Sequence, residues 1–246
     1  MLIRATTPET VTIPNRFNGP ARSANGGYAC GLVAGLIEGP AQVVLRRPPP
    51  LGVELHLVSS ERGVALREGK TTIATATRAC IDLELPRFLS FDEAIHASVD
   101  FGGFDRHPFP KCFVCGPRRA NGDGLRIFPG RVPDKPLIAA PWIPDEDLAD
   151  RHGLVWPEFV WAALDCPTGW VTTLMPPVQK VVVLGTLGVE HQRRVEAGRR
   201  YVLAAWPLRS EGRKFFAGAA LWSDAGDLHA VARATWIRVS EEEWSE

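Results

Sequence analysis

The chain has 246 residues, of which 45% are hydrophobic and 23% are charged, as is typical of a soluble globular protein with a sizeable core. The 28 basic and 28 acidic residues cancel, so we expect neither nucleic acid nor a membrane surface as the main partner. No apolar run approaches the roughly 20 residues of a membrane span. The first residues lack a signal-peptide pattern, which favours the cytoplasm.

The first half of the chain predicts one helix followed by antiparallel strands. After an extended piece at 11–14, residues rich in Gly, Ala and Cys predict a helix at about 26–37, which Gly39-Pro40 would end. Three strands are then expected, at 53–59, 64–67 and 71–83, with turns that contain glycine or charged residues between them.

Residues 85–123 are expected to link two halves. Ser90 and Glu93 have the spacing of a helix capping box. The rest contains Cys112-Phe113-Val114-Cys115-Gly116-Pro117. Cys112 and Cys115 have metal-ligand spacing, but no second pair exists, and His107 and Cys166 would join them only if the fold brought them together. With five scattered cysteines, reduced core thiols are favoured over disulfides, and no metal or other cofactor is predicted.

The second half repeats the order of the first. It predicts a strand at 137–142, a helix that begins near Pro157, and strands at 178–188, 200–207, 214–223 and 229–239. A long helix followed by antiparallel strands, given twice, predicts an α+β fold in which each sheet wraps around its helix. We therefore divide the chain into a first repeat at 1–84, a linker at 85–123 and a second repeat at 124–246.

The two predicted helices differ in their polar groups. The second helix is mostly apolar but contains Asp165, and the first helix has Ala34 at the corresponding position. A carboxylate beside apolar neighbours is desolvated, so its pKa should rise, which suits a general base. The alternative is a structural Asp that caps backbone near Pro167.

The first helix instead begins with Asn25-Gly26-Gly27, whose backbone N–H groups can hold a negatively polarised oxygen. The alternative for this segment is an ordinary Asn N-cap with closely packed glycines. Because each half supplies only part of the chemistry, we expect one composite site per chain.

The order and spacing of these segments resemble the double-hotdog acyl-CoA thioesterases of the thioesterase II type. The resemblance covers most of the chain and implies a double-hotdog fold that hydrolyses acyl-thioesters. In the first half it rests on Asn18-Gly19-Pro20, on Asn25-Gly26-Gly27-Tyr28, and on Arg47-Pro48-Pro49-Pro50, which it assigns to the first long strand. In the second half it rests on segments 196–201, 211–213 and 226–232.

The resemblance also implies site residues. In that family an Asp on the helix, a Thr on the next strand and a Gln on the last strand position a water molecule. The resemblance assigns the first two roles to Asp165 and Thr186, although plain strand propensity also explains a Thr at this position. Trp236 takes the place of the Gln and cannot orient water as an amide does.

The leading hypothesis is an acyl-thioester hydrolase in which Asp165 activates water and the Gly27 N–H holds the thioester oxygen. The residues expected to contact the substrate, an acyl-CoA or similar thioester, are Asn25, Gly26, Tyr28, Trp161 and Trp236. The alternative is a non-catalytic hotdog protein that binds acyl-CoA or lipid, which Trp236 favours. A hotdog hydratase ranks low, because it would need a His paired with an acid. A homodimer is left open. The arginines that suit coenzyme A phosphates, or equally a solvated strand edge, are Arg46, Arg47, Arg193, Arg194, Arg199 and Arg200.

Overall fold

The computed structural model describes residues 10–176 and 181–240. The first half contains β1 (Thr10–Thr12), α1 (Gly26–Ala34), β2 (Ala41–Leu45), β3 (Glu54–Ser60), β4 (Gly63–Glu68) and β5 (Thr71–Arg78). The middle contains α2 (Phe91–Val99). The second half contains β6 (Gly130–Arg131), β7 (Ile138–Trp142), α3 (Pro157–Trp170), β8 (Val181–His191), β9 (Tyr201–Glu211), β10 (Lys214–Ser223) and β11 (Leu228–Val239). Single 3-10 turns lie at Asn15–Phe17, Glu146–Leu148 and Val171–Leu174.

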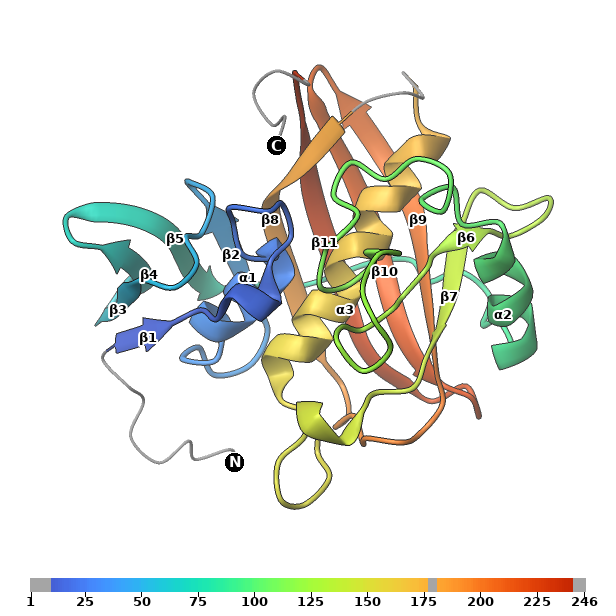
Figure 1. The fold of residues 1–246 in the computed structure, drawn as a ribbon, viewed down its shortest axis with the longest axis horizontal. Coiled ribbons are helices and arrows are strands. Elements are labelled where there is room, and N and C mark those ends of the chain that lie inside the picture. The colour runs from blue at the N-terminus through green and yellow to red at the C-terminus, as the bar shows by residue number, and fades with distance from the viewer. Residues whose placement is uncertain (1–9, 177–180, 241–246) are drawn as a thin grey trace.

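All the described strands form one antiparallel sheet. Its order is β1-β3-β4-β5-β2-β8-β11-β10-β9-β7-β6. The two halves meet where β2 pairs with β8, with Ala41 opposite Val189 and Val44 opposite Thr186. Figure 1 shows the strands of the second half curving around α3, while α1 lies beside α3 against the strands of the first half. The predicted α+β class is therefore confirmed.

Helices α1 and α3 run antiparallel and pack closely. A Cβ on Gly27 would lie 2.6 Å from the Trp161 carbonyl oxygen, and one on Gly31 would lie 2.5 Å from the Glu158 Cα. Since such distances are too short for a side chain, the two glycines set how near the helices approach. The Gly-rich sequence of α1 thus places its N-terminus against the middle of α3.

The segment between the halves covers both faces of the sheet. Residues 81–97 cross the outer face, where Ile81, Leu89 and Ala94 join a buried cluster with Val202 and Trp222. Residues 101–127 then return to the helix side and enter the main core. None of the helices in the described residues is both long and apolar enough to cross a membrane.

Several local expectations were correct. The Ser90–Glu93 capping box at α2 is confirmed, with both reciprocal hydrogen bonds present. The predicted strands at 53–59, 64–67, 137–142 and 214–223 appear within one or two residues of their expected bounds. Residues 178–180 of the strand expected at 178–188 lie outside the described residues.

The expectation that Arg47–Pro50 belongs to a long strand was wrong. The strand here is β2, which ends at Leu45, before three consecutive prolines that have no N–H to donate. The strand expected at 71–83 ends at Arg78, because the chain leaves the sheet there to cross its outer face. Helix α1 ends at Ala34, three residues before its expected end.

Candidate active site

Asp165 is held at the contact between α1 and α3. Its Oδ2 accepts hydrogen bonds from the Gly27 N–H at 2.8 Å and from Asn25 Nδ2 at 2.9 Å. Asn25 also caps α1, because its Oδ1 accepts from the Tyr28 N–H at 2.9 Å. Since that contact fixes which end of the amide accepts, Nδ2 must face the carboxylate. The N-cap predicted as an alternative to a functional Asn25 is therefore present, and the same side chain also contacts Asp165.

The other carboxylate oxygen of Asp165 is unusual. Asp165 is 2% exposed, and its Oδ1 has no hydrogen-bond partner in the described part of the chain. Burial raises the pKa of Asp165 to about 7, although hydrogen bonds from the Gly27 N–H and Asn25 act in the opposite direction. An acceptor with this pKa is partly ionised at neutral pH, which suits proton transfer to and from a bound molecule.

A cavity of about 470 Å³ opens beside Asp165 at the junction of the two halves. Asn25 and Gly26 contribute the α1 end of its wall, and Asp165 and Cys166 contribute the α3 side. Its volume is within the range of small-molecule sites. Its further lining includes Gly19, Pro20, Ser23, Ala24, Leu45, Pro48, Pro49, Phe109, Cys112, Val182, Val183, Leu184, Gly185, Trp236, Ile237 and Val239.

The role expected for the Gly27 N–H needs correction. This N–H donates to Asp165, so it is not directed at a thioester oxygen, and no carbon atom fits between the two groups. The Gly26 N–H, at the first position of α1, donates no hydrogen bond within the described residues, and Gly26 lines the cavity. The free backbone donor at this helix end is therefore Gly26, one residue earlier than expected.

Thr186 lies on the wrong face of β8 for the role expected of it. It pairs with Thr235, whereas the adjacent Trp236 pairs with Leu184, so Gly185 is an extra residue in β8. Leu184 and Leu187 both enter the main core beside the helices, which leaves Thr186 on the outer face. The assignment of Thr186 to the site was wrong, and Leu184 occupies the cavity wall instead.

Trp236 reaches the site, but its indole N–H already donates a hydrogen bond within the protein. The indole lies against Gly169 of α3 and lines the cavity. Its Nε1–H donates to Thr168 Oγ1 at 2.8 Å, and the Thr168 hydroxyl donates to the Asp165 carbonyl oxygen at 2.6 Å. Trp236 thus braces the turn of α3 that carries Asp165 and offers the cavity an apolar face.

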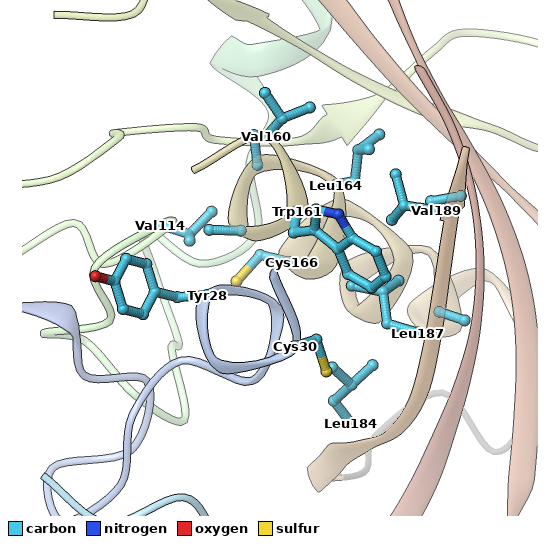
Figure 2. Close-up of a cluster of buried hydrophobic side chains, with 14 of the residues drawn as sticks. Tyr28, Cys30, Val114, Val160, Trp161, Leu164, Cys166, Leu184, Leu187 and Val189 are labelled. Atoms are coloured by element: carbon cyan, nitrogen blue, oxygen red, sulfur yellow. The ribbon is translucent and has the colours of Figure 1, made fainter. Parts of the chain in front are cut away.

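Trp161 and Tyr28 were expected to contact substrate, but neither lines the cavity. Figure 2 shows Trp161 against Leu187 and Val189 of β8, within the main core. Tyr28 extends from α1 away from β8 and stacks on Phe17, with ring centroids 4.3 Å apart. Trp161 was expected at the site from its place near Asp165 in the sequence, and Tyr28 from the resemblance of segment 25–28. Neither signal determines the direction of a side chain.

Only two of the six arginines considered for phosphate binding lie at the cavity. Arg46 and Arg47 follow β2 and line it, together with Arg213, which the sequence did not single out. Among the others, Arg193 pairs with Asp227 at 3.3 Å and Arg199 pairs with Glu196 at 3.5 Å. Arg213 was missed because strand pairing places it: Lys214 pairs with Ile237 of β11, and Ile237 lines the cavity.

A cluster of thiols borders the same cavity. The Sγ atoms of Cys112, Cys115 and Cys166 lie within 4.8 Å of one another, and all three residues are buried. Hydrogen bonds from the Cys115 and Cys166 thiols lower the pKa of Cys112 well below its ordinary value, while burial raises the pKa of Cys115. His107 also lies here, with Nε2 at 3.3 Å from Cys115 Sγ, and burial lowers the pKa of its ring.

Comparisons with solved structures agree on the fold. No protein-family model matches the chain, and no curated protein matches it in sequence. The tesB protein of Mycobacterium avium subs paratuberculosis is similar in structure with a TM-score of 0.62 at 10% identity, over 94% of this chain and 92% of that one. A candidate thioesterase II from Thermobifida fusca gives 0.57 at 16% identity, over 96% and 94%.

A third similar structure is a conserved protein with hot dog fold from Alicyclobacillus acidocaldarius. It has a TM-score of 0.58 at 11% identity, over 94% of this chain and 92% of that one. All three likenesses extend over both halves of the chain, so the expected resemblance to thioesterase-like hotdog proteins is confirmed at the level of the fold. The chain folds as a double hotdog, with one helix and one half of a shared antiparallel sheet from each repeat.

Proposed function

We propose that the protein hydrolyses acyl-thioesters, with Asp165 as the general base. The observation that carries the proposal is that the two carboxylate oxygens of Asp165 differ in their hydrogen bonds. Oδ2 is fixed by two donors, whereas Oδ1 is buried without a partner among the described residues. A buried acceptor without a partner costs stability, and a functional task is one reason why a protein keeps such a group. Accepting a proton from a water molecule in the cavity is such a task.

The other parts of the reaction follow from the cavity wall. Attack of water on the thioester carbon places negative charge on the carbonyl oxygen, which the Gly26 N–H at the start of α1 would stabilise. The proton taken by Asp165 would then pass to the thiolate leaving group. Leu184, Trp236 and Ile237 give apolar surface for an acyl chain. The name of the Thermobifida fusca structure supports this reaction class.

The thiol portion of the substrate is proposed to be coenzyme A. Arg46, Arg47 and Arg213 place three cationic side chains around one cavity, where phosphate groups would bind. The first two are consecutive at the end of β2, and the third comes from the turn after β9. Their convergence from separate elements favours recognition of a ligand over a simple solvated edge.

A second candidate function is binding of acyl-CoA without hydrolysis. The observation that favours it is the loss of two groups that the resemblance requires for water. Thr186 faces away from the cavity, and the Trp236 N–H is bound to Thr168. Without these two groups, only Asp165 remains to orient the water. If Asp165 alone does not suffice, the cavity binds the thioester without cleaving it.

The deciding experiment is hydrolysis of acyl-CoAs of graded chain length, followed through the absorbance of the thioester bond. Asp165→Asn keeps the volume of the side chain and can still accept from Gly27 and Asn25. We expect it to lower kcat about 10²- to 10⁴-fold. Asp105→Asn, at an exposed position, is the matched control and should be unchanged. Binding without turnover by the wild-type chain would establish the second function, and full activity of Asp165→Asn would reject Asp165 as the base.

A further inference from the structure

Three sulfur atoms from two distant segments converge beside the cavity. Cys112 and Cys115 come from the linker, and Cys166 comes from α3, one residue after Asp165. Cys112 Sγ and Cys166 Sγ are 3.7 Å apart, and all three thiols are unpaired and buried. The proposed hydrolysis uses none of them. Filling the core does not require three thiols in mutual contact either, since small apolar side chains would fill the same space.

The spacing of the sulfur atoms suits a metal ion. Two sulfur ligands, each about 2.3 Å from a tetrahedral zinc, lie about 3.8 Å apart. The observed 3.7 Å between Cys112 and Cys166 is close to this value, and the third sulfur lies within 4.8 Å of both. Soft thiolate ligands select zinc over hard cations such as magnesium or calcium. We propose that Cys112, Cys115 and Cys166 bind one Zn²⁺ ion through their three thiolates.

The two linker cysteines lie on a rigid turn. The Gly116 N–H donates to the Cys112 carbonyl oxygen at 2.9 Å, and the Phe113 N–H donates to the Asn18 carbonyl oxygen at 2.7 Å. A Cβ on Gly116 would lie 2.5 Å from the backbone N and O of Cys112, so only glycine fits this turn. The segment Cys112–Gly116 therefore presents two sulfur atoms in a fixed arrangement toward α3.

Two ring N–H groups lie next to the sulfur atom of Cys115. Trp170 Nε1 lies 3.4 Å from Cys115 Sγ, and His107 Nε2 lies 3.3 Å from the same sulfur. The Phe109 N–H donates to His107 Nδ1 at 2.9 Å, which leaves the ring proton on Nε2. His107 is therefore a donor to the Cys115 thiolate and not itself a ligand. Such donors stabilise the negative charge that three thiolates bring to one ion.

The three sulfur ligands leave a fourth position of the zinc free. Cys112 and Cys166 both line the cavity. A water molecule or another small ligand in the cavity can therefore fill that position. Zinc here would also tie the linker to α3 next to Asp165, so the ion would stabilise the wall of the site.

The test measures metal and not hydrolysis, so its outcome is independent of the proposed function. The full chain, treated with chelator and then dialysed against Zn²⁺, is expected to retain one zinc per chain by elemental mass spectrometry. Co²⁺ in its place should show the intense sulfur-to-cobalt charge-transfer absorption. Cys112→Ser and Cys166→Ser should abolish stoichiometric binding, while Cys80→Ser, at an exposed cysteine, should not change it. His107→Ala should weaken zinc affinity about 10- to 100-fold.

Several results would overturn the site. They are a wild-type chain without stoichiometric zinc, a cobalt spectrum without sulfur-to-metal absorption, or a folded Cys112→Ser variant that retains zinc fully. An intact mass lower than expected by two hydrogen atoms would mean a disulfide in place of the metal site. If a serine variant fails to fold, the wild-type zinc content and cobalt spectrum decide the question. Complete loss of zinc in a folded His107→Ala variant would contradict its role as a donor.

Discussion

Gly27 and Asp165 fix each other across the contact between α1 and α3. The Gly27 N–H donates to Asp165 Oδ2 at 2.8 Å, and a Cβ on residue 27 would overlap the Cβ of Asp165. The glycine therefore makes room for the carboxylate and also binds one of its oxygens. Oδ1 is the other carboxylate oxygen, and it has no hydrogen-bond partner among the described residues.

Gly27→Ala is expected to destabilise the fold, because the added methyl group would collide with α3. A methyl group forced into a packed core costs typically about 1–3 kcal/mol of unfolding free energy. Urea unfolding followed by tryptophan fluorescence would measure the change. Gly102→Ala is the matched control, since a Cβ there meets no atom within 4 Å and the backbone is not in the left-handed region. Equal unfolding free energies for the two variants would contradict the packing described here.

Asn25→Ala is expected to lose both a helix cap and a donor to Asp165. Loss of an N-cap costs about 0.5–2 kcal/mol, and loss of a hydrogen bond to a charged group costs about 1.5–3 kcal/mol. Ser90→Ala removes the N-cap of α2, which lies far from Asp165, and should show only the first cost. Chemical denaturation of both variants tests this. A stability loss for Asn25→Ala no greater than that of Ser90→Ala would mean that the Asp165 contact adds nothing.

Trp236→Phe is expected to destabilise the chain by about 0.5–1.5 kcal/mol beyond its loss of volume, because the hydrogen bond to Thr168 is lost. Trp222→Phe makes the same change at another buried tryptophan, in the outer cluster. A double-mutant cycle with Thr168→Val isolates the interaction. The coupling free energy between residues 236 and 168 should be near 1 kcal/mol, as is typical of a net hydrogen bond. A value near zero would show that Trp236 acts only through its shape.

Arg213→Ala is expected to raise the KM for acyl-CoA several-fold and to leave the KM for the corresponding acyl-pantetheine unchanged. The pantetheine ester lacks the phosphates that the arginine would bind. Steady-state kinetics at two salt concentrations would measure both, since added salt should reduce the difference. Arg62→Ala, in the exposed turn between β3 and β4, serves as the control. Equal effects of Arg213→Ala on the two substrates would place the phosphates elsewhere.

The sequence determined the features that depend on neighbouring residues. Repeated helix-then-strand order predicted an α+β fold with each sheet wrapped around its helix, and the family resemblance implied the double hotdog. The spacing of Ser90 and Glu93 predicted the capping box of α2. Asp165 was recognisable as a candidate site residue, because an acid within an apolar helix is often kept for a functional role. Asn25 was recognisable as a helix cap from its place before Gly26 and Gly27. The signals for the capping box, Asp165 and Asn25 are local, whereas the repeated order of elements is read along the whole chain.

Only the tertiary structure decided how those residues are used. The Gly27 N–H meets a carboxylate 138 positions later in the chain, and Cys112 meets a thiol 54 positions later. The extra residue Gly185 in β8 turns Thr186 to the outer face, a shift that depends on pairing with β11. Such outcomes follow from strand register and from the approach of two helices. They are set by the packing of distant segments, which local propensity does not encode.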